Sequence, residues 1–257
     1  MSIFQAIILG ILQGLTEFLP VSSSGHLVLA QKFFGLETPP IFFDVMVHVG
    51  TLFAIVVYLR KDLMKIILGL KNKEIQKLLA LVIVGTLPVV IVGFLLLDFI
   101  EEIFNSFLAV GISFLITAAI LTGTVFAKKL EKNLEKMSWL DSIFIGLFQA
   151  LAILPGVSRS GSTISAGLFR KIDRESAFKF SFFLAIPAIF GALILQLIQD
   201  KIPLDCGFSV GFLGFVFSAI FGLLALKILE RVLIRGKFFF FAIYCFVLGM
   251  AVLLFLA

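Results

Sequence analysis

Six apolar stretches of the chain are each long enough to cross a lipid bilayer as a helix. They cover residues 41–59, 78–98, 106–127, 175–199, 208–229 and 238–257. A helix needs about 20 mostly apolar residues to cross the hydrocarbon core. The composition agrees, because 61% of the residues are hydrophobic and 14% are charged, whereas about 25% are charged in a soluble domain. We therefore expect an all-α polytopic membrane protein, with residues 1–257 forming a single domain whose main solvent is the lipid bilayer.

Two further apolar regions, 2–35 and 140–169, are each interrupted by a polar loop. The first interruption is Pro20–His26 and the second is Pro155–Gly161. Clusters of Pro, Gly and Ser of this kind end helices. Broken backbone is tolerated at membrane depth only where protein or a water-filled cavity covers it. We therefore predict two re-entrant helix–loop–helix hairpins.

Basic residues gather in four of the segments that connect these elements. The segments are 60–77, 128–137, 170–179 and 227–237, and they hold most of the 21 Lys and Arg residues. The positive-inside rule places all four in the cytoplasm. Both ends of region 140–169 are then cytoplasmic, and the N- and C-termini fall outside. The first hairpin is therefore expected to enter from the outer face, and the second from the inner face.

A short internal repeat relates the two polar loops at a fixed offset of 136 positions. The matches are Gln13 with Gln149, Leu15 with Leu151, Val21 with Val157, Ser22 with Ser158, Ser24 with Ser160 and Gly25 with Gly161. Each half contains one hairpin followed by three spans, and because three is odd the second half is inverted. Inverted repeats with broken helices commonly form a site where the repeats meet. We predict repeats over 1–127 and 138–257, joined by a cytoplasmic linker at 128–137.

The two loops carry the groups that a phosphate-binding site requires. Arg159 offers a planar fork of donors that matches phosphate oxygens. The helix that follows each loop begins with free backbone N–H groups, which attract anions. The candidate phosphate-binding residues are Ser22, Ser24, Gly25, Ser158, Ser160, Gly161 and Thr163. The loops are not Walker loops, because no Gly-Lys-Ser/Thr sequence ends them.

A carboxylate and a carboxamide precede the first loop on one helix face. Gln13 and Glu17 are four residues apart, so their side chains project from the same side of a helix. Oxygen ligands of this kind suit Mg²⁺ or Ca²⁺, which also bridge to phosphates. Glu17 could instead act as a general base. Both interpretations make Gln13 and Glu17 candidate site residues.

The chain has two histidines, and they differ in their surroundings. His26 ends the first loop, close in sequence to Glu17 and three serines. It could donate a proton to a leaving phosphate, accept one from a serine or attack phosphorus itself. His48 lies within an apolar stretch without such company. For His48 we expect a supporting role or simple packing.

Other function classes find little support in the sequence. The net charge of +5 follows from the predicted cytoplasmic segments, so we expect no nucleic-acid partner. Two cysteines are too few for a disulfide framework. The motifs HExxH, CxxC and GxSxG and the Rossmann fingerprint do not occur, which argues against the chemistries that they mark.

The run Gln13–His26 resembles the signature of the bacterial undecaprenyl-pyrophosphate phosphatases of the BacA type. The run Pro155–Gly161 is similar to the second motif of that family, and the resemblance covers essentially the whole chain. It implies hydrolysis of undecaprenyl diphosphate to undecaprenyl phosphate, the lipid carrier of cell-wall synthesis, and a link to bacitracin resistance. It also implies a place in the bacterial inner membrane, a divalent cation, and an active site on the periplasmic side.

The resemblance assigns roles to four residues. Glu17 matches the essential glutamate of a Glu/Gln-x-x-x-Glu pair, and Gln13 takes the first position, which leaves this pair with one carboxylate. Ser23, His26 and Arg159 match the remaining catalytic positions. The spacing does not decide whether Ser23 or His26 is the nucleophile.

A transporter is the alternative function, because inverted repeats with broken helices are also the layout of alternating-access carriers. Such a protein would flip undecaprenyl phosphate, alone or in addition to hydrolysis. The sequence leaves the oligomeric state open, including a homodimer.

Overall fold

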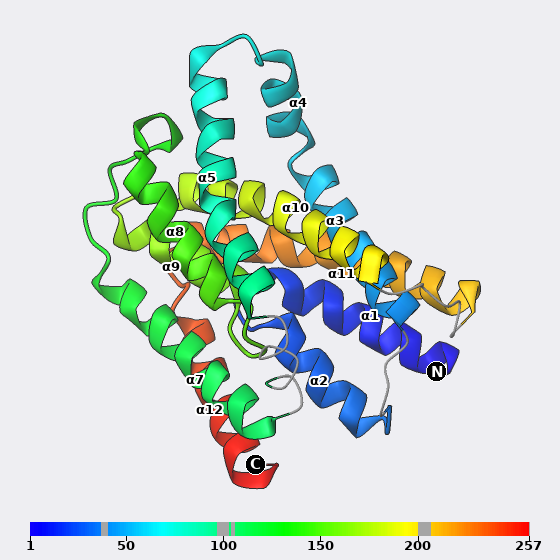
Figure 1. Cartoon of the computed structure of the whole chain (residues 1–257). Helices are drawn as coiled ribbons and strands as arrows, with labels where there is room; N and C mark the ends of the chain where they lie inside the picture. Colours follow the sequence, from blue (N-terminus) through cyan, green and yellow to red (C-terminus); the bar gives the residue numbers. More distant parts are fainter. Residues whose placement is uncertain (37–40, 97–102, 104–105, 200–206, 257) are drawn as a thin grey trace.

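The computed structural model describes residues 1–36, 41–96, 103, 106–199 and 207–256. These residues form α-helices joined by loops and short 3₁₀ turns, with one isolated bridge between Lys132 and Ile172 (Figure 1). Five helices are long and apolar enough to cross a membrane. They are α3 (Ile41–Tyr58), α5 (Lys73–Leu95), α7 (Phe107–Gly123, continued to Phe126 by a 3₁₀ turn), α10 (Arg174–Gln199) and α11 (Phe208–Ile234). The expectation of an all-α, multi-pass membrane protein is confirmed.

The sixth expected span is shorter than predicted. Residues 238–257 were expected to cross the membrane, and the structure forms α12 (Phe240–Phe255), a helix of 16 residues. A helix of this length rises about 24 Å, which is less than the hydrocarbon core of about 30 Å. Helix α12 packs along α7. The structure therefore supports five of the six expected spans at full length.

Both interrupted regions fold as helix–loop–helix units. The first unit is α1 (Ile3–Phe18) and α2 (Ser23–Phe33), and the second is α8 (Trp139–Leu151) and α9 (Arg159–Phe169). Helices α2 and α9 have 11 residues each, so neither can cross a bilayer. Helices α1 and α8 both begin at a serine capping box. The serine side chain accepts from the backbone N–H three residues later, and the side chain of that residue accepts from the backbone N–H of the serine.

The second helix of each unit begins at a serine of the polar loop. Ser22 Oγ accepts from the backbone N–H of Gly25 at 3.4 Å, and Ser158 Oγ accepts from that of Gly161 at 3.1 Å. Ser22 Oγ also accepts from Gly156 N at 3.1 Å, which joins the two loops. Ser22 has a φ of 67°, an unusual conformation for a residue with a side chain. The first loop is therefore held in a conformation that the second loop helps to fix.

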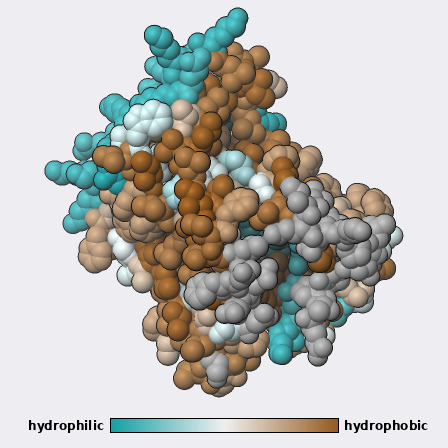
Figure 2. All heavy atoms as spheres, in the orientation of Figure 1, coloured by the Kyte–Doolittle hydropathy of each residue, from teal (hydrophilic) through white to brown (hydrophobic). Residues whose placement is uncertain are grey.

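The four basic segments lie together at one end of the molecule. Lys77 Nζ donates to the backbone oxygen of Glu135 at 2.8 Å. Lys179 lies 3.3 Å from the Asp62 carboxylate, and Gly236 lies beside the Arg174 guanidinium. Figure 2 shows hydrophilic side chains at the end that carries α4 (Arg60–Leu68) and apolar ones over much of the rest of this face. The contacts among these segments therefore define a basic pole at the end of the molecule that carries α4 (Figure 1).

Candidate active site

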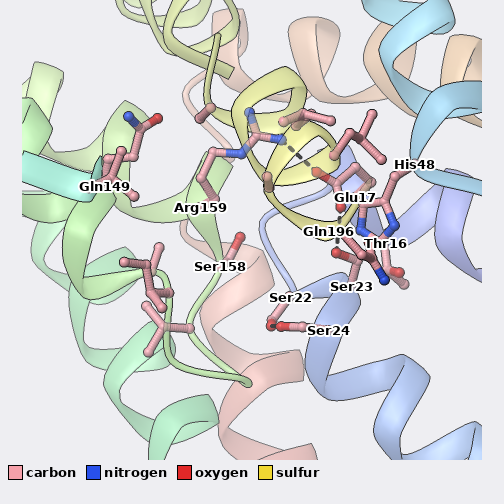
Figure 3. Close-up of a pocket in the computed structure, with 18 residues that line it drawn as sticks. Thr16, Glu17, Ser22, Ser23, Ser24, His48, Gln149, Ser158, Arg159 and Gln196 are labelled. Atoms are coloured by element: carbon pink, nitrogen blue, oxygen red, sulfur yellow. Dashed lines mark hydrogen bonds and ion pairs between the residues drawn. The ribbon is translucent and has the colours of Figure 1, made fainter. Parts of the chain in front are cut away.

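The two polar loops meet at a cavity of about 310 Å³ (Figure 3). Helices α3, α5 and α10 complete its wall. The polar residues that line it are Thr16, Glu17, Ser22, Ser23, Ser24, His48, Gln149, Ser158, Arg159 and Gln196. The apolar ones are Val89, Ala152, Ile153, Val157, Ala188, Ile189, Ala192 and Leu193. The cavity lining thus combines charged and polar groups with apolar side chains, as an amphiphilic ligand requires.

An ion pair joins the two hairpins across this cavity. Arg159 Nη2 lies 2.6 Å from Glu17 Oε1, and the side chains are only 14% and 9% exposed. Glu17 comes from the end of α1 and Arg159 from the first turn of α9. Both charges are largely withdrawn from water, so removing either side chain would leave the other charge buried without compensation. The structure thus brings together two residues that are 142 positions apart.

The second oxygen of the same carboxylate is bound by the first hairpin. Ser23 Oγ donates to Glu17 Oε2 at 2.5 Å, and Gln13 Nε2 donates to the same atom at 3.2 Å. The hydroxyl proton of Ser23 therefore points at a base. A serine hydrogen-bonded to a group that can accept its proton is the arrangement of an activated nucleophile.

The expected phosphate-binding residues divide into two groups. Ser22, Ser24 and Ser158 line the cavity. The other four, Gly25, Ser160, Gly161 and Thr163, do not line it and hold the loops instead. The N–H groups of Gly25 and Gly161 donate to the serine side chains that cap α2 and α9. Ser160 Oγ lies 3.3 Å from Ser158 Oγ. Thr163 donates to the backbone oxygen of Arg159 at 2.8 Å.

His26 lies outside the polar cavity. Its Nδ1 is 2.7 Å from the backbone oxygen of Ser22, and its Nε2 is 2.7 Å from the Tyr244 hydroxyl. A carbonyl oxygen only accepts, so Nδ1 carries the proton and Nε2 accepts from Tyr244. The ring is 8% exposed and lines a separate apolar groove among α1, α2, α7 and α12. In this arrangement both ring nitrogens are occupied in fixing the first loop.

His48, in contrast, lines the cavity beside Glu17 and Ser23 (Figure 3). Its Nδ1 lies 2.7 Å from the backbone oxygen of Asp44, which only accepts, so Nδ1 donates in this bond. The local sequence gives no sign of this position, because the polar neighbours of His48 come from other helices. Thr16, Gln149 and Gln196 also line the cavity without an expected role, although the 136-residue offset already paired Gln149 with Gln13.

The family model for the bacitracin resistance protein BacA matches residues 6–251. The chain belongs to the BacA family. A protein of Carboxydothermus hydrogenoformans named undecaprenyl-diphosphatase is 45% identical over 98% of this chain and 97% of its own. A protein of Desulforapulum autotrophicum with the same name is 41% identical over 97% of both chains. A protein of Bacillus cereus named undecaprenyl-diphosphatase 4 is 42% identical over 98% of this chain and 97% of its own.

The family resemblance implies a divalent cation, and the donors of this BacA-family chain fit one that is held largely by substrate. No group of three or more His, Cys, Asp or Glu side chains is placed to hold a metal among the described residues. Glu17 supplies a carboxylate, and Gln13 Oε1 next to it is buried with no hydrogen-bond partner in the described part of the chain. Mg²⁺ is often bound by one or two carboxylates together with substrate phosphates. Glu17 is suited to such a site, and Gln13, which is fully buried and is not among the lining residues, supports Glu17 from behind through its Nε2.

Proposed function

We propose that this protein hydrolyses undecaprenyl diphosphate to undecaprenyl phosphate and inorganic phosphate. The observation that carries the proposal is the hydrogen-bonded chain Arg159–Glu17–Ser23 in a cavity with an apolar side. The relatives support the substrate, since each is named undecaprenyl-diphosphatase. None of these three names refers to transport, so the transporter alternative gains no support from them.

The proposed chemistry begins with a proton transfer from Ser23 to Glu17. Ser23 Oγ then forms a bond with the terminal phosphorus while the bond from that phosphorus to the bridging oxygen breaks. Undecaprenyl phosphate leaves with the bonding electron pair and takes up the proton held by Glu17. Water then attacks the phosphoserine and gives a proton to Glu17, which returns it to Ser23 Oγ as inorganic phosphate leaves. Arg159 faces the charge that spreads over the transferred phosphoryl oxygens, which is the main requirement of phosphoryl transfer. The short Ser23–Glu17 hydrogen bond of 2.5 Å favours Ser23 over His26 as nucleophile.

A divalent cation, Mg²⁺ or Ca²⁺, is part of the proposal. Glu17 is the residue that we propose holds it, with Gln13 supporting Glu17 through its Nε2. When bound with the diphosphate it would supply positive charge that offsets the phosphate oxygens. Gln13 in place of a second carboxylate keeps the site less negative, which favours entry of an anionic substrate.

We also propose the inverted-repeat architecture, with repeats over 1–127 and 138–257 joined by the linker 128–137. Helix packing supports it: α1 packs on α11 of the other half, and α8 packs on α5 of the other half. Both contacts are close at a glycine. A Cβ on Gly10 would lie 3.0 Å from Gly214 O, and one on Gly146 would lie 2.4 Å from Gly85 O. Gly10 and Gly146 are again 136 positions apart.

The orientation that we propose places the cavity toward the outer, periplasmic side. Helix α10 begins at Arg174 within the basic pole and ends at Gln199. Gln196, in the last turn of α10, lines the cavity. At 1.5 Å per residue this position is about 33 Å along the helix from Arg174. With the basic pole in the cytoplasm, the cavity extends toward the opposite face.

Release of phosphate from undecaprenyl diphosphate by the purified protein tests the function. We expect activity in the wild type and in Lys71→Ala, an exposed position far from the cavity. Ser23→Ala, Glu17→Gln and Arg159→Ala should each lose at least about a hundredfold in kcat/KM, because each removes a charge or proton-transfer group used in the transition state. Equal rates for all variants, or an inactive wild type with Mg²⁺ and Ca²⁺ both supplied, would contradict the proposal.

A further inference from the structure

The Gln149 side chain is buried against the cavity with its hydrogen-bonding groups unused. It is 1% exposed, and neither its Nε2 nor its Oε1 has a hydrogen-bond partner among the described residues. Burying an amide without partners costs free energy, so such groups usually pair with something. Gln149 lines the cavity that also holds Arg159 and Glu17. Its position therefore points to a ligand that enters the cavity.

The first hairpin shows why this amide has no partner within its own hairpin. Gln13, the repeat counterpart of Gln149, donates to Glu17 four residues later. The residue four positions after Gln149 is Ile153, which lines the cavity. Its aliphatic side chain cannot accept a hydrogen bond. The second hairpin thus keeps the amide but lacks the carboxylate. This difference leaves Gln149 Nε2 available as a donor.

Arg159 contributes a second unused donor to the same region. Its Nη2 pairs with Glu17, whereas its Nη1 is buried without a partner in the described part of the structure. In Figure 3 Arg159 lies between Glu17 and Gln149. The guanidinium therefore divides the cavity into an end with Glu17 and Ser23 and an end with Gln149.

A lipid diphosphate has two phosphates to place in these two ends. The terminal phosphate must reach Ser23 for the proposed chemistry, so the phosphate that remains on the lipid belongs at the other end. Ile153, four residues after Gln149, lines the cavity, as do Ile189 and Leu193 of α10. These side chains provide apolar surface for the first part of the polyprenyl chain. We infer that Gln149 binds the lipid-linked phosphate, donating from Nε2 to one of its oxygens beside Arg159 Nη1. This inference rests on the proposed function, because it assigns the second phosphate of the same substrate.

Steady-state kinetics of Gln149 variants of the full-length protein test the inference. Gln149→Leu keeps the approximate size of the side chain but cannot donate, and Gln149→Glu keeps its shape but adds negative charge. We expect Gln149→Leu to raise the KM for undecaprenyl diphosphate at least about tenfold, and Gln149→Glu to raise it more, since each loses a hydrogen bond to a charged group. The inhibition constant of undecaprenyl phosphate should rise in parallel. Inhibition by inorganic phosphate, which fits the Ser23 end, should change little.

A purely structural role predicts the opposite pattern. If Gln149 only packs or holds water, Gln149→Leu should keep the KM and the product inhibition of the wild type, and it should unfold at the same or a higher temperature. Unchanged KM and inhibition in both variants would overturn the inference while leaving the phosphatase function intact. If the wild type released no phosphate, the proposed function would fail. The inference would then be tested by binding of undecaprenyl phosphate, measured as a rise in unfolding temperature. A larger rise in the wild type than in either folded variant would support it, and equal rises would overturn it.

Discussion

His26 shows how a residue close to a reactive loop can act through position. Its ring bonds the Ser22 carbonyl on one side and Tyr244 on the other, and Ser22 directly precedes Ser23. We expect His26→Ala to lower kcat about a hundredfold, the loss that a small misplacement of a reactive group can cause. His26→Asn places an amide N–H where Nδ1 was and should recover at least about tenfold. Tyr244→Phe, which removes the other bond, should lose only a few fold.

The pH dependence of kcat separates this role from proton transfer. A positioning residue can be replaced by Asn without moving the shape of the profile, whereas an acid or base cannot. Equal losses in His26→Ala and His26→Asn, with one limb of the wild-type profile missing in both, would show that His26 takes part in the chemistry.

The residues that the sequence made predictable are those in the interrupted loops. Glu17, Ser23 and Arg159 stand out because polar groups at membrane depth are costly and few, and the structure brings all three together. His48 and Gln149 were not predictable in the same way. Both lie on helices that look apolar, and their access to the cavity depends on packing between helices that are distant in the sequence.

At the scale of elements, apolar length predicted the long helices well. Runs of about 20 apolar residues became α3, α5, α7, α10 and α11, because only a helix satisfies the backbone in lipid. Length alone did not predict the shorter α12, or α4 within the basic segment 60–77. Helix ends depend on capping and on neighbours, and an apolar run carries little information about either.

The contact between α8 and α5 supports a prediction about stability. A Cβ on Gly146 would lie 2.4 Å from the backbone oxygen of Gly85, so Gly146→Ala must push the two helices apart. We expect a loss of about 1–3 kcal/mol in the free energy of unfolding, as for other overpacked sites. Gly191→Ala is the matched control, because a Cβ there meets no atom of the described residues within 4 Å, and it should be neutral or stabilising by up to about 1 kcal/mol.

Unfolding in mixed detergent micelles, followed by circular dichroism, measures both variants on the same scale. Gly146→Ala should also lose phosphatase activity, because α8 leads into the loop that precedes Arg159, the first residue of α9. A Gly146→Ala protein as stable as Gly191→Ala would show that the α5–α8 contact is looser than the structure describes.

The whole molecule has a clear polarity of charge. The basic segments 60–77, 128–137, 170–179 and 227–237 were grouped from the sequence by a rule about topology, and contacts such as Lys77 with Glu135 and Lys179 with Asp62 join them in space. The same rule places the connecting segments Gly35–Pro40, Asp98–Ser106 and Asp200–Cys206 on the outer side, and they fall largely outside the described residues. The grouping of basic segments at one pole could thus be predicted, because the number of Lys and Arg residues in each connecting segment, rather than detailed packing, sets its side of the membrane.

Labelling with a membrane-impermeant maleimide tests the orientation that this polarity predicts. Both probes use a Cys206→Ser background and keep Cys245, which is buried. Ser209→Cys is exposed at the start of α11, away from the basic pole, and Lys71→Cys is exposed within it. In intact cells we expect modification of Ser209→Cys, and of Lys71→Cys only after the membrane is made permeable. The reverse pattern would place the basic pole outside and the cavity toward the cytoplasm, and modification of both in intact cells would indicate that the chain inserts in two orientations.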